Sequence, residues 1–269
     1  MKVIAAVPHY NAPGMLRNLL AQLSQDSFDQ IVVLDDASRD KPTKIAAEFP
    51  AVTFVYGPEN LGAAGNRNRV LEVVSDGIVW FIDADMAIIS KNNADALRRI
   101  FKYRRTRMIG GLIYTKAGSQ MDWNYGHEMH PVHDARFEEL MTSLGAGDPT
   151  AWRRLQKYGW DYAWLQPEIS KPKERVVDWV AEGSFALPVD LFRRVGGYDA
   201  AFRYHEGQDL ARRLRSSGAK VRLKPEIITR HLENKGRTHH QKDFETARRL
   251  FFQKHWGMAQ QVYGALYKS

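Results

Sequence analysis

Two aspartates, Asp83 and Asp85, stand at the end of the apolar run "GIVWFIDAD" at residues 77–85. Residues two apart on a regular strand point to opposite faces, but where the strand ends the turning chain lets both side chains converge. Carboxylate oxygen is a preferred ligand of Mg²⁺ and Mn²⁺, which keep positions open for substrate phosphate. The pair therefore favours a metal site that stabilises a departing diphosphate. The alternative is a solvated turn that caps the next element.

Acidic residues also end a second apolar run, "QIVVLDDAS" at residues 30–38. A carboxylate such as Asp36 at that place can accept a hydrogen bond from an N–H of a planar ligand, for example a nucleobase. The alternative is that this segment caps the following helix through Ser38 and Asp40.

The stretch "ENLGAAGNRNRV" at residues 59–70 combines small residues with a basic side chain at the start of a predicted helix. Gly62 and Gly65 would let a ligand approach the backbone, and both a helix N-terminus and Arg67 favour phosphate. No Gly-Lys-Ser/Thr follows, so the stretch is not a Walker loop.

The elements that must position these residues alternate between strands and helices. Strands are predicted at 2–10, 30–38, 52–57, 77–85 and 107–115, and helices at 15–24, 41–49, 63–74 and 93–103. Such alternation with short connections indicates a mostly parallel sheet covered by helices on both faces. Ligands of these sheets bind beyond the carboxyl ends of the strands, which is where the acids stand.

The rest of the chain divides into three parts. Residues 116–175 are rich in aromatic, histidine and charged residues, which predicts a helical insertion. Its aromatic side chains could form a platform for a sugar or base, or simply the insertion's own core; they are Trp123, Tyr125, Trp152, Trp160, Tyr162 and Trp164. Strand and helix patterns return at 176–231, and 238–269 reads as a basic helical tail. We interpret His127, His130 and His133 as loop or packing residues, because Pro131 interrupts the helix that would align them.

Composition narrows the classes of function. The chain has 269 residues, a formal net charge of +8, a pI near 9.6 and no cysteine. Disulfides and thiolate metal sites are therefore excluded, and any metal must be held by oxygen or imidazole. No apolar run is long enough to span a membrane, and the first residues do not resemble a signal peptide, so we expect a cytoplasmic protein. The positive charge suits a phosphorylated ligand, nucleic acid or an anionic membrane surface.

Several segments together resemble, in this order, those of family 2 glycosyltransferases of the GT-A fold. They are "VPHYNAPGMLRNLLAQLSQDSFDQIVVLDDASRD", "NLGAAGNRN", "FIDADM", "GSFALPVDLFRRVGGYDAAF", "EGQDLARRLRSSG" and "IITRH". The resemblance covers residues 1–115 and 176–231. It implies a GT-A domain at 1–231, with a nucleotide-sugar-binding half at 1–115, the insertion at 116–175 and an acceptor half at 176–231. Residues 232–269 would form the tail.

The resemblance also implies roles for single residues. Asp36 matches the family's base-binding aspartate, and Pro8 and Tyr10 lie where the nucleotide would bind. Arg67 matches an arginine near the diphosphate. The pair Asp83 and Asp85 matches the D-x-D motif, in which Asp85 would hold Mn²⁺ or Mg²⁺ directly and Asp83 would contact ribose or a metal-bound water. His231 matches a further metal or diphosphate contact. An ordinary surface histidine is the alternative for His231.

One departure from the family pattern concerns the catalytic base. The family usually has Glu-Asp-x-Asp-Leu, in which the aspartate after glutamate takes the proton, but this chain reads Glu206-Gly207-Gln208-Asp209-Leu210. Glycine has no group that accepts a proton. We expect Glu206 to take the role, with Asp209 and Glu182 as alternatives. A reaction without such a base is a further alternative, and Asp209 could instead cap the helix that follows.

The expected function is transfer of a hexosyl or deoxyhexosyl group from a nucleotide-diphosphate sugar, UDP- or dTDP-linked, to an acceptor hydroxyl with inversion. The acceptor would be a glycan or lipid-linked saccharide, with the basic tail near an anionic membrane. DNA bearing a hydroxyl is an alternative acceptor that the positive charge would suit. A GT-A domain that binds nucleotide sugar or glycan without catalysis is the alternative of another class, and Gly207 is the residue that favours it.

Overall fold

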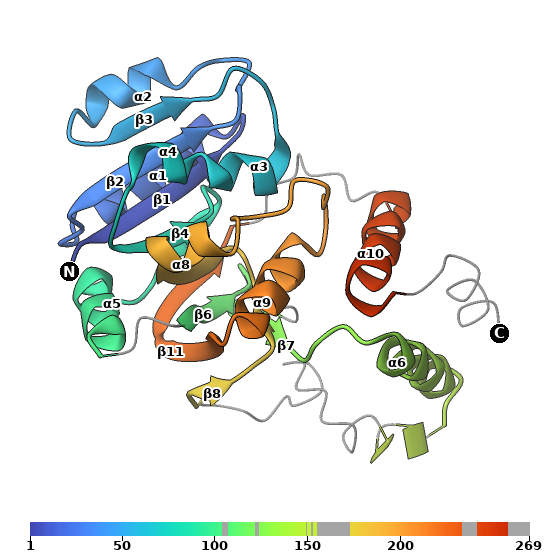
Figure 1. The fold of residues 1–269 in the computed structure, drawn as a ribbon. Helices are drawn as coiled ribbons and strands as arrows, with labels where there is room; N and C mark the ends of the chain where they lie inside the picture. Colours follow the sequence, from blue (N-terminus) through green and yellow to red (C-terminus); the bar gives the residue numbers. More distant parts are fainter. Residues whose placement is uncertain are drawn as a thin grey trace.

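The computed structural model of the chain describes residues 1–103, 107–121, 124–148, 150–151, 153–154, 173–232 and 241–257. Its strands are β1 (Val3–His9), β2 (Gln30–Asp35), β3 (Thr53–Tyr56), β4 (Ile78–Ile82), β5 (Met86–Ile88), β6 (Arg107–Tyr114), β7 (Tyr125–Gly126), β8 (Arg175–Val176), β9 (Trp179–Val180), β10 (Ser184–Pro188) and β11 (Lys220–His231). Its helices are α1 (Pro13–Leu23), α2 (Thr43–Glu48), α3 (Gly62–Asn68), α4 (Val70–Val73), α5 (Asn93–Phe101), α6 (Pro131–Gly145), α8 (Val189–Arg194), α9 (Glu206–Ser216) and α10 (Gln241–Trp256). Figure 1 shows their arrangement.

The central sheet runs in the order β3-β2-β1-β4-β10-β6-β11-β5. The first four of these strands are parallel, as the strand–helix alternation predicts. Strand β10 then inserts antiparallel between β4 and β6, and β11 pairs parallel with β6 and antiparallel with β5. The predicted mostly parallel, Rossmann-like α/β fold is confirmed, with a mixed second half that brings the ends of β11 and β4 together.

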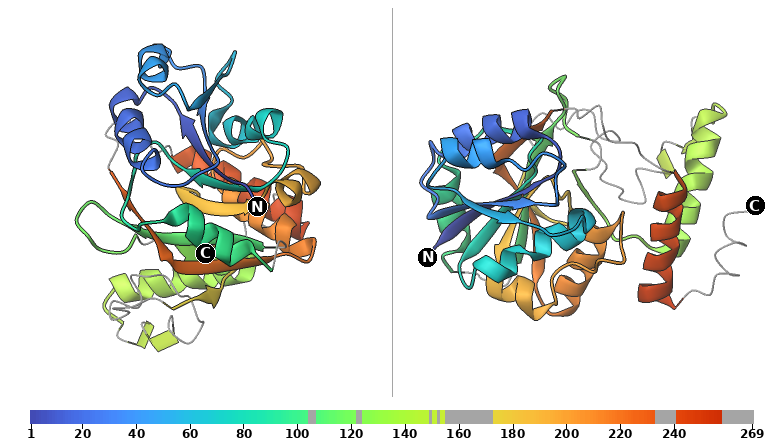
Figure 2. Two further views of the ribbon diagram at one scale, coloured as in Figure 1. Left: turned by 90° about the vertical axis from the view of Figure 1, so that its left-hand side faces the viewer. Right: turned by 90° about the horizontal axis from the view of Figure 1, so that it is seen from above.

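Helices cover both faces of the sheet, as the right-hand view in Figure 2 shows. One face packs against α1, α2 and α5, and the other against α4, α8 and α9. Helix α1 buries Leu16, Leu19, Leu20 and Leu23, whose spacing of three or four residues places them on one side of the helix. Strand β4 is buried along its whole length, which explains its continuous apolar sequence.

Two local predictions differ from the structure. The helix predicted at 63–74 is divided into α3 and α4 at Arg69. Helix α2 begins after Pro42 without a side-chain cap, so neither Ser38 nor Asp40 caps it. Ser38 instead donates to Asp35 and accepts from the N–H of Asn11, which ties the loops after β2 and β1 together.

Helices α6 and α10 lie on the side of the molecule away from β1–β3 (Figure 2). Part of the predicted tail forms α10, whose Phe251 and Phe252 are buried with Phe202. His130 packs against the ring of Trp256 at 4.3 Å between centroids, and Tyr125 is buried, so both have packing roles. Predictions for Trp123, Trp152, Trp160, Tyr162 and Trp164 lie outside the described residues. Within the described part of the chain, no helix is both long and apolar enough to cross a lipid bilayer.

Candidate active site

A cavity of about 720 Å³ opens at the carboxyl ends of β1, β2 and β4. This volume is within the range of small-molecule sites, which is about 300–1,000 Å³. Eight of the nine residues predicted for the site line the cavity: Pro8, Tyr10, Asp36, Arg67, Asp83, Asp85, Glu206 and His231. Asp209 is not among its lining residues.

Three buried residues beside the cavity, His9, Asp35 and Ser38, were not assigned to the site by the sequence analysis, and His9 lines the cavity. His9 and Asp35 end β1 and β2, and the His9 Nδ1 atom lies 2.8 Å from a carboxylate oxygen of Asp35. The other ring nitrogen of His9 accepts the backbone N–H of Ala12, so Nδ1 is the atom that donates to Asp35. Burial alone would raise the pKa of Asp35, but hydrogen bonds from His9 and Ser38 lower it. The hydrogen bonds among His9, Asp35 and Ser38 hold the ends of β1 and β2 together.

Asp36 holds the start of α3. Its two carboxylate oxygens accept the backbone N–H groups of Leu61 and Gly62 at 2.9 Å each, and Arg69 donates to one of them at 2.9 Å. Gly62 has a φ of +73°, a conformation that glycine adopts without strain. A carboxylate has about four acceptor positions, so one remains for a ligand. The backbone N–H of Gly62 already donates to Asp36 and is not available to a phosphate. At the start of α3, Arg67 is therefore the side chain that suits a phosphate.

Arg67 lies at the centre of the polar cluster in the cavity. It donates to Asp83 at 2.7 Å, and its other terminal nitrogen is 3.6 Å from a carboxylate oxygen of Glu182. Its guanidinium also lies 5.7 Å from the ring centroid of Tyr198. Burial would lower the pKa of Arg67, but the charges of Asp83, Tyr198 and Glu182 raise it, so the side chain stays cationic. Within the described residues, its Nε and Nη1 atoms have no hydrogen-bond partner, so part of its donor capacity is unused by the protein.

The predicted convergence of Asp83 and Asp85 has a simple structural cause. Strand β4 ends at Ile82 and β5 begins at Met86, so both acids belong to the turn between two strands. The N–H of Met86 donates to the carbonyl of Asp83 and closes this turn. Strand β5 then pairs with β11 in a register that sets His231 opposite Met86.

This register brings Asp85 and His231 together. The Nε2 atom of His231 is 3.5 Å from a carboxylate oxygen of Asp85, and both side chains are partly exposed at the cavity. Among the described residues, no group of three or more His, Asp or Glu side chains is arranged to hold a metal alone. An open site of this kind suits Mg²⁺ or Mn²⁺, which are commonly held by one or two protein ligands together with substrate phosphate and water. The pair therefore fits the predicted ion.

Glu182 and Glu206 are the two carboxylates on the side of the cavity formed by β10 and α9. Glu206 is the first residue of α9 and is only 5% exposed. Glu182 precedes β10, and burial, reinforced by the charge of Glu206, raises its pKa to about 8. Burial and the charge of Glu182 likewise raise the pKa of the Tyr198 hydroxyl. Carboxylates outnumber cations around Glu182, because Glu206 and Asp83 face it together with a single cation, Arg67.

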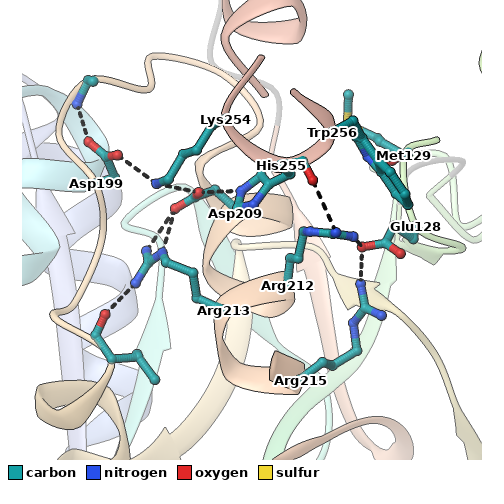
Figure 3. A network of polar contacts seen from close by, with 12 residues as sticks. Glu128, Met129, Asp199, Asp209, Arg212, Arg213, Arg215, Lys254, His255 and Trp256 are labelled. Carbon is teal, nitrogen blue, oxygen red and sulfur yellow. Dashed lines mark hydrogen bonds and ion pairs between the residues drawn. The ribbon is translucent and has the colours of Figure 1, made fainter. Parts of the chain in front are cut away.

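Asp209, one turn after Glu206 on α9, does not line the cavity and binds side chains of α10, as Figure 3 shows. Its oxygens are 2.7 Å from Lys254, 2.8 Å from His255 and 2.9 Å from the Nε atom of Arg213. Burial opposes its ionisation, but these hydrogen bonds lower the pKa of Asp209 to about 2. The alternative that made Asp209 the catalytic base does not fit this geometry. It does not cap α9 either, since the helix begins at Glu206.

A second ion-pair group near Asp209 joins α9 to the segment before α6 (Figure 3). Arg212 and Arg215 of α9 both bind Glu128, which lies just before α6. The guanidinium of Arg212 lies 4.4 Å from the ring centroid of Trp256, whose indole N–H donates to the carbonyl of Met129. Much of the basic character of α9 and α10 is therefore used inside the protein.

Comparison with known proteins relates the chain to a family. The family model described as "Glycosyl transferase family 2" matches residues 5–156. The chain is 24% identical over 148 residues to "Glycosyltransferase GlyA" of Streptococcus pneumoniae, which is 53% of this chain and 20% of that protein. It is 31% identical over 90 residues to "Uncharacterized glycosyltransferase YibD" of Escherichia coli K12, which is 31% of this chain and 26% of that protein. The matched part is thus at most about a quarter of either relative.

Solved structures share the fold across nearly the whole chain. GalNAc-T7, crystallised with UDP, GalNAc and Mn²⁺, superposes with a TM-score of 0.68 at 14% identity, covering 98% of this chain and 50% of that chain. The mannosyltransferase PcManGT from Pyrobaculum calidifontis, in complex with GDP-Man and Mn²⁺, gives a TM-score of 0.58 at 15% identity, covering 98% and 73%. These likenesses establish the GT-A fold. None of the comparisons supports a DNA acceptor or a membrane contact.

Proposed function

Because this chain belongs to glycosyl transferase family 2, we propose that it transfers a sugar from a nucleotide-diphosphate sugar to an acceptor hydroxyl in the presence of Mn²⁺ or Mg²⁺. The observation that carries the proposal is the meeting of Asp85 and His231, 3.5 Å apart, in the same cavity as the buried Arg67. Together they offer imidazole, carboxylate and guanidinium groups to a metal diphosphate.

The metal ion would be held by Asp85 and His231. A bound divalent cation supplies charge neutralisation to the diphosphate as it leaves. Asp83 is held by Arg67, which leaves it suited to a contact with ribose or with a water on the ion. The use of Mn²⁺ is in keeping with the two fold relatives that were crystallised with this ion.

The rest of the donor would lie between β1, β2 and α3. Arg67 would bind the diphosphate, since a guanidinium recognises phosphate oxygens through two parallel N–H groups. Asp36 has one acceptor position left for a base N–H, and Pro8 and Tyr10 line the same end of the cavity. Tyr10 is 46% exposed, so its ring is available to a planar ligand.

We propose UDP- or dTDP-linked hexose or deoxyhexose as donor and a hydroxyl of a glycan or lipid-linked saccharide as acceptor. The support for a nucleotide sugar is the family itself and the relatives bound to UDP or GDP-Man. A carboxylate that removes the acceptor proton during attack on the anomeric carbon gives inversion. Glu206 lines the cavity and was the expected base; the structure offers a second carboxylate beside it.

Binding of nucleotides with and without Mn²⁺ tests the proposal. We expect UDP-glucose, UDP-GalNAc, GDP-mannose or dTDP-glucose to raise the melting temperature of the protein only when Mn²⁺ is present. Asp85→Ala should weaken this Mn²⁺-dependent binding by about 100-fold, which corresponds to about 2.7 kcal/mol. Asp190→Ala is the matched control, because Asp190 is an exposed aspartate of α8 that pairs with Arg194.

Unchanged affinity in Asp85→Ala, measured by calorimetry, would exclude the metal site. Release of nucleoside diphosphate from the bound donor separates an enzyme from a domain that only binds nucleotide sugar. Loss of this release on treatment with EDTA, and its return with Mn²⁺, would show that the reaction requires the ion.

A further inference from the structure

The Glu182 side chain occupies the space beside the cavity that a side chain at position 207 would need. A Cβ atom placed on Gly207 would lie 2.7 Å from Cγ and 2.8 Å from Cδ of Glu182. These distances are far below van der Waals contact, so any side chain at position 207 would displace the glutamate. The space that the second residue of α9 would use is therefore filled by a carboxylate from another part of the chain.

Glu182 is held in this place by the backbone around it. Its neighbour Gly183 accepts the N–H of Asp83, and Ser184 begins the pairing of β10 with β4. A Cβ on Gly183 would lie 2.1 Å from the terminal methyl of Met86, so the segment passes tightly over the strand that follows the acidic turn. The position of Glu182 is thus tied to that of Asp83 and Asp85.

Four titratable groups face Glu182, two from helices and two from loops. They are Glu206 of α9, Arg67 of α3, Asp83 after β4 and the Tyr198 hydroxyl. Arg67 is the one cation among them and is already paired with Asp83 at 2.7 Å. Glu182 lines the cavity and its side chain is 19% exposed, so part of this side chain faces the space open to an acceptor.

The neighbouring carboxylates are less suited to accept a proton from an acceptor. Asp209 is fully buried and bound to Lys254, His255 and Arg213 outside the cavity. Asp83 accepts a hydrogen bond from Arg67 at 2.7 Å, so one of its oxygens is already occupied. Glu206 is 5% exposed and its charge acts on Glu182.

We propose that Glu182 is the catalytic base of the transfer reaction and that it replaces the carboxylate missing at Gly207. This inference rests on the proposed function. The acceptor oxygen forms a bond to the anomeric carbon while the bond from that carbon to the phosphate oxygen breaks. The electron pair of the broken bond leaves with the nucleoside diphosphate, and the acceptor proton passes to a carboxylate oxygen of Glu182, from which solvent later removes it.

The environment of Glu182 supports this role. Burial and the charge of Glu206 favour its protonated form and raise its pKa to about 8. A base is most effective when its pKa is near the working pH, because it is then both available and strong. Turnover should therefore rise with pH up to about 8, as the carboxylate becomes ionised.

The experiment uses the full chain, Mn²⁺ and whichever of UDP-glucose, UDP-GalNAc, GDP-mannose or dTDP-glucose it hydrolyses fastest, with water in place of the acceptor. Glu182→Gln should lower turnover by about 100-fold, the middle of the range for loss of a general base. Its affinity for the matching nucleoside diphosphate with Mn²⁺ should stay within about threefold. The pH dependence below 8 should disappear from the residual activity.

A paired exchange provides the second test. Glu182→Ala empties the shared volume, and adding Gly207→Asp to it places a carboxylate there from α9. The double variant should recover at least about tenfold over Glu182→Ala alone, within the range that a positioned base contributes. Glu182→Ala with Gly207→Asn is the matched control, which fills the same volume without a base and should not recover.

The outcomes distinguish this inference from the proposed function. Wild-type protein that binds and hydrolyses a donor while Glu182→Gln keeps more than half of its turnover would overturn the role of Glu182 and leave the function standing. If the double variant is no more active than its asparagine control, the inference that Glu182 replaces a carboxylate at position 207 is overturned. Wild-type protein that binds no nucleotide sugar with Mn²⁺ would instead refute the proposed function itself.

Discussion

Glu182 and Asp209 are both largely buried carboxylates next to α9, yet their surroundings drive them in opposite directions. Asp209 is bound by the side chains of Arg213, Lys254 and His255, and its pKa falls to about 2. Glu182 shares Arg67 with Asp83 and faces Glu206, and its pKa rises to about 8. The difference lies in the ratio of cations to carboxylates around each group. Asp209, which is surrounded by cations, stays ionised and joins α9 to α10. Glu182, which has few cations around it, is able to take up and release a proton.

The largest effect is expected from breaking the Asp209 cluster. Asp209→Asn removes the charge of a fully buried carboxylate whose partners Lys254 and Arg213 are partly exposed. Loss of hydrogen bonds between charged groups at such a site destabilises a protein by about 3 kcal/mol. For a chain of this size that lowers the melting temperature by roughly 6–12 °C. Donor affinity should be unchanged, because Asp209 does not line the cavity.

Calorimetric unfolding together with donor titration measures both quantities. Asp190→Asn is the control, since its exposed pair with Arg194 contributes less than about 1 kcal/mol. A melting temperature equal to that of the wild type would show that Asp209 does not join α9 to α10.

A smaller effect, counted per pH unit, is expected in the pH dependence of stability. Between about pH 5 and 8, folded protein keeps the proton on Glu182, while the unfolded chain, with an ordinary glutamate pKa near 4.5, has released it. The folded state then binds more protons than the unfolded state, so this group makes stability fall as pH rises through that range.

Glu182→Gln removes this contribution, so its stability relative to wild type should grow by up to about 1.4 kcal/mol per pH unit between pH 5 and 8. Urea unfolding of both proteins at several pH values measures the difference. A difference that is constant with pH would mean that Glu182 has an ordinary pKa, and the contrast with Asp209 would fail.

The smallest effect concerns the influence of Glu206 on Glu182. Glu206→Gln removes a negative neighbour, and the pKa of Glu182 should fall as a result. The rising part of the turnover–pH profile should move to lower pH by about one unit, with donor affinity unchanged. Turnover that drops at every pH without such a shift would instead return the base role to Glu206, as the sequence alone suggests.

The nucleotide half of the fold is predictable from sequence because its signals are local. Continuous apolar runs such as Ile78–Ile82 form buried parallel strands, and acids right after them must emerge at one edge of the sheet. The convergence of Asp83 and Asp85 follows from this, since both lie in a turn. The pairing of Asp85 with His231 depends in addition on the register of β5 with β11, which joins segments about 140 residues apart and leaves no local signal.

The roles of the remaining carboxylates were harder to predict because they depend on distant partners. Asp209 keeps the register of the family motif, but its role is decided by Lys254 and His255 on α10. Glu182 could be named only as an alternative, because sequence does not show that its side chain fills the space at Gly207. Asp36 is the acid that the sequence predicts at the end of β2. Its contacts with Leu61, Gly62 and Arg69 could not be predicted, because these residues are distant from β2 in the sequence.

Helix α9 carries both kinds of carboxylate, with Glu206 at its first residue and Asp209 one turn later. A protein shortened ahead of α10 would lose Lys254 and His255, two of the three side chains that bind Asp209, and would uncover Phe202. Trimming the end of the chain for expression or crystallisation would therefore loosen the helix that delivers Glu206, and any drop in turnover would reflect lost support rather than a missing reactive group.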